Sequence, residues 1–175
     1  MDAEAPETET TVVRLFVGHA ESPVWFPEPR DWHEMGFDAD LTDDLRRWDA
    51  EWYASRDRED FEWIADEPEI EHRRRGVALA QRIAGALGAP FVVEIDGVDG
   101  VDGVDADGSP DRVRVSSEQE AMQPRAAARF RAWAQEARAE HARIRAAVAD
   151  GGGRWVAYAP LSGHTFEPGL GSTGD

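Results

Sequence analysis

Apolar and polar positions follow two different periods along this chain, and together they predict four strands and three helices. Short runs rich in β-branched and aromatic residues predict strands over residues 11–17, 91–95, 112–116 and 154–159. Apolar residues spaced three and four positions apart predict helices over residues 41–55, 66–87 and 124–149. Residues 22–37 carry three prolines, which predict an irregular loop pinned by its aromatic side chains.

Local signals mark the ends of two of these helices. Thr42 is the predicted N-cap of the first helix. Asp66 and Glu69 have the spacing of a capping box at the start of the second helix. Gly88 suits the left-handed closing position of that helix, and Pro90 prevents its continuation.

The order of elements predicts the fold class. With the two helices after the first strand taken as one crossover, the order is β-α(α)-β-β-α-β, which is typical of a ferredoxin-like α+β sandwich. We therefore expect an antiparallel sheet with the helices on one face. The expected organisation is an acidic disordered tail at 1–10, a single domain at 11–160 with a flexible acidic Asp-Gly-Val loop at 96–110, and a loose tail at 161–175.

Composition narrows the chemistry that this chain can support. Its 175 residues include no cysteine, which excludes disulfides, thiol nucleophiles and cysteine-ligated metals. Seven tryptophans and seven phenylalanines supply large apolar side chains for a core. The chain has neither a long apolar run nor a basic, apolar start, so we expect no membrane partner and a cytoplasmic location.

Charge is both large and uneven. The net charge is −17, and residues 1–72 hold 22 acidic against 6 basic side chains, whereas residues 121–175 hold 5 against 7. Every basic residue is arginine, which fits either GC-rich coding DNA or adaptation to salt. The asymmetry predicts an acidic face in the first half of the chain. Direct binding to nucleic acid is disfavoured, because a phosphate backbone requires a basic surface.

Three motifs match known sites by letter but not by chemistry. A calcium loop that starts at Asp105 fails because Pro110 stands where glycine is needed and Ser116 where glutamate is needed. The single Glu69-x-x-His72 lacks the second copy that di-iron bundles use. The glycine pattern at residues 169–174 lacks a following helix to hold a pyrophosphate. We therefore predict no metal and no cofactor.

Three stretches of the chain resemble a known group of proteins. They are the aromatic and proline-rich run around Trp25 and Phe26, LTDDLRRWDAEWYA (Leu41 to Ala54), and RRGVALAQRIAGALG (Arg74 to Gly88) leading into the strand at Phe91. With these stretches, residues 24–96 resemble small Trp-rich uncharacterised proteins common in actinobacteria. That group has no assigned activity, so the resemblance implies a lineage and carries over no functional residue.

The uneven charge leads to the main functional hypothesis, a binding module rather than an enzyme. An acidic face with loop tryptophans suits a basic protein partner, as in an immunity or inhibitor protein that covers a basic target. The residues expected to bind are Trp25, Trp32, Asp38, Asp40, Asp43, Asp44 and Glu51.

Two alternatives come from other classes of protein. A small enzyme or ligand-binding protein would use a pocket between sheet and helices, lined by His19, His141 and Trp155, with either histidine as a catalytic base. His141 also lies on the apolar stripe of its helix, which favours a buried structural histidine. An oligomer-forming protein would instead make a homodimer through exposed sheet edges.

Overall fold

The computed structural model describes residues 10–17, 20–57, 62–96, 112–151, 157–159 and 164–166. The chain divides into two compact units, Met1–Trp133 and Ala134–Asp175, and each is described by itself.

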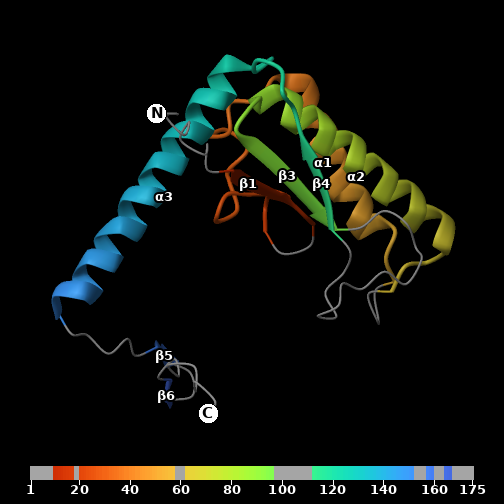
Figure 1. The fold of residues 1–175 in the computed structure, drawn as a ribbon. Coiled ribbons are helices and arrows are strands. Elements are labelled where there is room, and N and C mark those ends of the chain that lie inside the picture. The colour runs from red at the N-terminus through yellow and green to blue at the C-terminus, as the bar shows by residue number, and fades with distance from the viewer. Residues whose placement is uncertain are drawn as a thin grey trace, which may run out of the picture. The chain divides into compact units, whose positions relative to one another are not determined.

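The first unit is built around a four-stranded mixed sheet (Figure 1). Its strands lie in the order β2-β1-β3-β4, with β1 parallel to β3 and both edge strands antiparallel to their neighbours. The strands are β1 (Thr11–Leu15), β2 (Val24–Trp25), β3 (Phe91–Asp96) and β4 (Arg112–Ser116). The helices are α1 (Ala39–Ala54), α2 (Asp66–Leu87) and the first turns of α3 (Pro124–Gly151).

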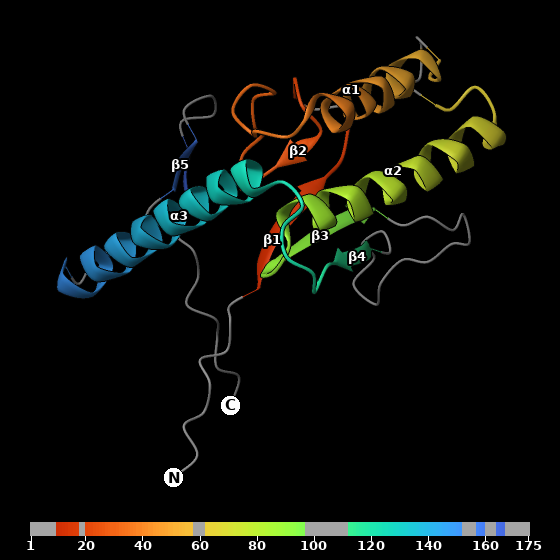
Figure 2. The same ribbon diagram turned by 90° about the horizontal axis from the view of Figure 1, so that it is seen from above.

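One face of the sheet is apolar and is covered by helices. Alternate residues of the central strands, such as Val13 on β1 and Val93 on β3, are fully buried there. Helices α1 and α2 form an antiparallel pair that lies side by side, with α2 against β3 and β4 (Figure 2). Gly76 lets the pair approach closely, because a Cβ at this position would lie 2.8 Å from the ring of Trp48.

An aromatic cluster joins the sheet to the start of α3. The ring of Phe130 lies 5.6 Å from Phe26 and 6.1 Å from Phe91, measured between centroids. The rings of Phe37 and Trp133 contact Phe130 at 5.6 and 5.0 Å. Two of these pairs are tilted and two are edge-on, and edge-on contact is a favoured geometry for aromatic pairs. The cluster therefore fixes the loop between β2 and α1, which contributes Phe26 and Phe37.

The opposite face of the sheet carries a polar row that spans neighbouring strands. Arg14, Glu94 and Arg114 lie directly opposite one another on β1, β3 and β4. The carboxylate of Glu94 is 5% exposed, accepts a hydrogen bond from Arg114 and forms a 3.5 Å ion pair with Arg14. A one-residue slip of register would turn Glu94 towards the apolar face, so the row fixes the register.

The second unit contains the rest of α3 and a short hairpin. Strand β5 (Ala157–Ala159) pairs antiparallel with β6 (His164–Phe166). Ile144 and Val148 on α3 are 37% and 40% exposed.

None of the helices in the described ranges combines the length and the apolar character needed to cross a membrane.

The α+β class predicted from the sequence is confirmed, but the ferredoxin-like order is not. The expected antiparallel sheet is wrong, because β1 and β3 are direct parallel neighbours instead of being separated by β4. The position beside β1 is taken by β2, a two-residue strand that the proline-rich loop concealed. The predicted last strand pairs with β6 in a separate hairpin, part of which falls in the tail predicted to be loose.

Two predicted helix caps are also wrong. Helix α1 begins three residues earlier than its predicted cap Thr42, because Asp38 provides the cap instead. Helix α2 has Ala65 at its N-cap position and no side-chain cap, so the expected capping box does not form. Gly88 does close α2 with a positive φ of 63°. The predicted tail at 1–10 and loop at 96–110 lie almost entirely outside the described residues.

Replacement of Phe130 by alanine tests the aromatic cluster. Because the ring is fully buried among four aromatic side chains, we expect Phe130→Ala to lower the free energy of unfolding by about 3–5 kcal/mol. Urea denaturation followed by far-UV circular dichroism measures the change. Ile64→Ala is the control, since Ile64 is 66% exposed and its loss should cost about 0.5 kcal/mol or less. Equal effects would contradict the packing described.

Candidate functional site

The site predicted from the sequence centres on the start of α1, where Asp38 turns out to be structural. Its Oδ1 accepts from the backbone N–H of Leu41 at 2.9 Å, which caps the helix. Its Oδ2 accepts from the side-chain amide of Gln123, and its own backbone N–H donates back to Gln123, both at 2.8 Å. Asp38 therefore ties α1 to the segment before α3, and its carboxylate is already committed.

Six other carboxylates lie on the segments before α1 or on the first turns of that helix, and we call this set the acidic segment. All six are exposed, and in the part of the chain that the structure describes only Asp43 forms an ion pair, at 3.4 Å with Arg46. The acidic segment consists of Glu21, Glu28, Asp31, Glu34, Asp40 and Asp43. Negative charge is thus concentrated on the loop before α1 and on the first turns of that helix.

The acidic segment is held in place by contacts of its own residues. Phe26 and Met35 are 5% and 0% exposed and anchor the loop in the core. The indole N–H of Trp32 donates to the backbone carbonyl of Glu21 at 2.8 Å. The carboxylate of Asp31 accepts from the backbone N–H of His33, also at 2.8 Å. The loop is irregular but internally bonded.

Both candidate anchor tryptophans are half-buried and support the loop. Trp25 stacks on Phe16 with ring centroids 4.6 Å apart, and its buried indole N–H has no partner among the described residues. The guanidinium of Arg46 lies 5.2 Å from the ring centre of Trp32. Neither tryptophan projects freely as the anchor that the sequence suggested.

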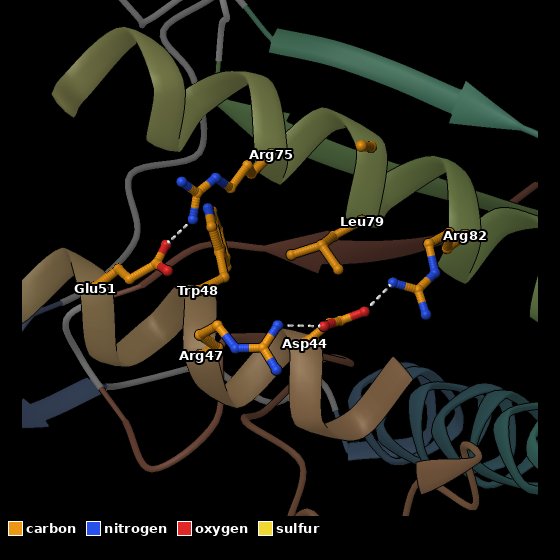
Figure 3. Close-up of a pocket in the computed structure, with 8 residues that line it drawn as sticks. Asp44, Arg47, Trp48, Glu51, Arg75, Leu79 and Arg82 are labelled. Atoms are coloured by element: carbon orange, nitrogen blue, oxygen red, sulfur yellow. Dashed lines mark hydrogen bonds and ion pairs between the residues drawn. The ribbon is translucent and has the colours of Figure 1, made fainter. Parts of the chain in front are cut away.

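The remaining two candidate carboxylates pair with arginines of α2 (Figure 3). Asp44 accepts from Arg82 at 2.5 Å and from Arg47 at 2.6 Å. The hydrogen bond from Arg82 lowers the pKa of Asp44, burial opposes that shift, and Arg47 lowers the pKa further. Glu51 accepts from Arg75 at 2.5 Å. These carboxylates are neutralised and do not add to the acidic segment.

These pairs border a cavity of about 180 Å³ between α1 and α2, which we call the interhelix groove. Trp48 from α1 and Leu79 from α2 point into it and form its apolar surface (Figure 3). The sequence placed a pocket between the sheet and the helices, whereas this cavity lies between two helices. Its lining residues are Asp44, Arg47, Trp48, Glu51, Arg75, Ala78, Leu79 and Arg82.

A buried histidine supports the groove from behind. The indole N–H of Trp48 donates to the backbone carbonyl of His72 at 2.8 Å, and Nε2 of His72 lies 3.0 Å from the carbonyl of Trp48. Because a carbonyl only accepts, Nε2 carries a proton. The two rings stack at 4.7 Å, and Trp63 approaches His72 at 5.3 Å. Burial is the main cause that lowers the pKa of His72, although the bond to Trp48 opposes it.

The other candidates do not assemble into a site within the described residues. His141 is exposed rather than buried on an apolar stripe, and His19 lies outside the described residues. Glu69 pairs with Arg73, so its carboxylate is not free to hold a metal ion together with the buried His72. No group of histidines and carboxylates in the described ranges could hold a metal ion. The loop at 96–110 and the glycine pattern at 169–174 lie outside those ranges.

Sequence reasoning missed the arginines of the groove. Arg75 and Arg82 stand on α2 one heptad apart, and Asp44 and Glu51 stand on α1 with the same spacing. A seven-residue spacing returns to nearly the same helix face, so the complementary spacing is a signal that the sequence contained. It became useful only once the two helices were known to be neighbours.

Comparison with known proteins assigns neither a family nor a function to this chain. No protein-family model matches this chain, and no curated protein or solved structure is significantly similar to it. The resemblance of residues 24–96 to small Trp-rich proteins therefore stays a prediction.

The buried His72 predicts a pH-dependent stability. The unfolded chain takes up a proton near the usual histidine pKa of 6.5, but the folded chain does so only at lower pH. The stabilisation is therefore complete above pH 6.5 and is lost as the pH falls from there towards the lower folded-state pKa. We expect urea denaturation to show a decline in the free energy of unfolding over that window. His72→Gln, which keeps an N–H donor, should flatten it, and an unchanged slope would contradict this account.

Proposed function

We propose that this chain is a protein-binding module that recognises a basic protein through the acidic segment. The observation that carries the proposal is a set of five exposed carboxylates, Glu21, Glu28, Asp31, Glu34 and Asp40, that form no ion pair within the described residues. They lie on or next to a loop whose backbone is held by its own contacts. An immunity or inhibitor protein that covers a basic target would use the same surface chemistry. The proposal concerns binding and assigns no reaction.

Unpaired charge is what distinguishes the acidic segment from the rest of α1. Asp44 and Glu51 already accept from three arginines, so a basic partner would have to displace those bonds. Carboxylates without an internal partner attract a cation at no such cost. Complementary charge mainly speeds encounter and fixes orientation. The proposed surface therefore keeps Asp40, which forms no ion pair within the described residues, and Asp43, whose single pair with Arg46 is exposed and 3.4 Å long. It no longer relies on Asp44 and Glu51.

A held loop also lowers the entropic cost of binding. The anchors Phe26 and Met35 and the bond from Trp32 to Glu21 restrict the loop before any partner arrives. Binding by a segment that is already ordered loses less conformational freedom than binding by a disordered one. In this proposal, the tryptophans of the loop contribute by holding the carboxylates in position.

Two charge-matched variants test the proposed surface. The first neutralises Glu28, Asp31, Glu34 and Asp40 as Glu→Gln and Asp→Asn changes. The second neutralises Glu118, Glu120, Glu136 and Glu140, which are equally exposed but lie elsewhere in the sequence. The two variants carry the same net charge and differ in where the charge is removed; the second also breaks the exposed ion pair of Glu140 with Arg143.

Isothermal titration of a basic peptide of about ten lysines, at about 25 mM salt, measures the effect. We expect the first variant to bind about tenfold more weakly than the parent chain, and the second to change affinity about twofold or less. Circular dichroism confirms that both variants are folded. Equal loss in both variants would mean that the acidity acts as a uniform coat, and the proposal would fail.

A further inference from the structure

We propose that the interhelix groove binds a small organic carboxylate that carries one apolar group of about the size of an aromatic ring. Arg47 and Arg82 would hold the carboxylate, while Trp48 and Leu79 would contact the apolar group. This site goes beyond the proposed function, because it uses different residues and selects a ligand of opposite charge.

The size of the groove limits the ligand. Its volume is about 180 Å³, whereas pockets for drug-sized ligands usually measure roughly 300–1,000 Å³. Leu79 points into the space from α2, and Trp48 faces it from α1 (Figure 3). Trp48 is 4% exposed and is fixed from behind by its bonds with His72, so the apolar surface is rigid. One ring fits this surface better than a larger ligand does.

The charge of the groove determines the sign of the ligand. At the Asp44 end of the groove, Arg47 and Arg82 share a single carboxylate and leave one net positive charge, whereas Arg75 at the other end is matched by Glu51 and Glu71. A cation would meet this excess of arginine directly. A single carboxylate would balance it, whereas an ion with two negative charges would also face the carboxylates of Asp44 and Glu51.

The two arginines that flank Asp44 keep donors available. Arg47 and Arg82 each use one amino group on Asp44 and make no other polar contact among the described residues. A guanidinium has five N–H donors, so most of them remain open to a second acceptor. The side chains are 65% and 43% exposed, which leaves these donors within reach of solvent. Arg75 is occupied by both Glu51 and Glu71 and closes the other end of the groove.

Phenylacetate is the probe, and phenylacetamide and benzylamine are its neutral and cationic counterparts. The indole N–H signal of Trp48 in a proton–nitrogen NMR spectrum reports binding, since this group lies behind the groove. We expect saturable shifts with phenylacetate and a dissociation constant of about 1–10 mM, as suits so small a ligand. The two counterparts should bind about tenfold more weakly or not at all.

Two arginine variants locate the carboxylate. Arg82→Gln should weaken phenylacetate binding about fivefold or more, because it removes one of the two guanidinium groups proposed to hold the carboxylate. Arg143→Gln is the matched control, since it breaks a similar exposed pair, with Glu140, outside the groove. Absence of saturable shifts, equal binding of phenylacetamide, or equal affinity in the two variants would overturn the proposal. None of these results would contradict the proposal that the acidic segment binds a basic protein.

Discussion

Arginines of α2 neutralise carboxylates of α1 across the interhelix groove, and this pairing decides where the negative charge of the chain stays uncompensated. Asp44 and Glu51 lie in the middle of α1 and are matched by Arg82 and Arg75. Among the described residues, the carboxylates before and at the start of α1 form no ion pair with an arginine of α2, and only Asp43 pairs at all, with Arg46. The acidic first half of the chain therefore has two parts. In the middle of α1 the carboxylates are paired with arginines of α2, and in the acidic segment the carboxylates stay exposed. Exposed ion pairs of this kind contribute little to stability, so their main consequence is the distribution of charge.

The stability that holds this arrangement comes from burial rather than from charge. The apolar face of the sheet, the aromatic cluster around Phe130 and the stacked pair of Trp48 and His72 remove large side chains from water. The same contacts position both candidate surfaces. Phe26 holds the loop that carries the acidic segment, and Trp48 forms the apolar side of the interhelix groove. Fold and function thus depend on the same buried aromatic residues.

Elements that depend on local periodicity could be predicted from the sequence, and arrangements that depend on distant neighbours could not. The apolar spacing located the helices α1, α2 and α3, and β-branched runs located β1, β3 and β4. Which strands are neighbours is decided by packing between residues far apart in the chain, and the parallel pairing of β1 with β3 was therefore missed. Strand β2 has only two residues, too few to show any period.

The sequence predicted the location of the candidate site but not the partners of its carboxylates. Composition located the acidic half of the chain, but it could not distinguish a free carboxylate from a paired one or from a helix cap. Asp38 became a cap because Gln123, 85 residues later, bonds to it from both sides. The negative charge of Asp44 is compensated because Arg82 reaches it from another helix. Both outcomes require contacts between elements that no local pattern contains.

The ion pair between Asp44 and Arg82 is the most direct place to test the account. NMR titration of the side-chain carboxyl carbons gives the pKa of Asp44 in the parent chain and in an Arg82→Gln variant. We expect a pKa below the usual aspartate value in the parent and a shift back towards that value in the variant. An Asp44 that titrates at the usual value in both proteins would contradict the division of charge described above.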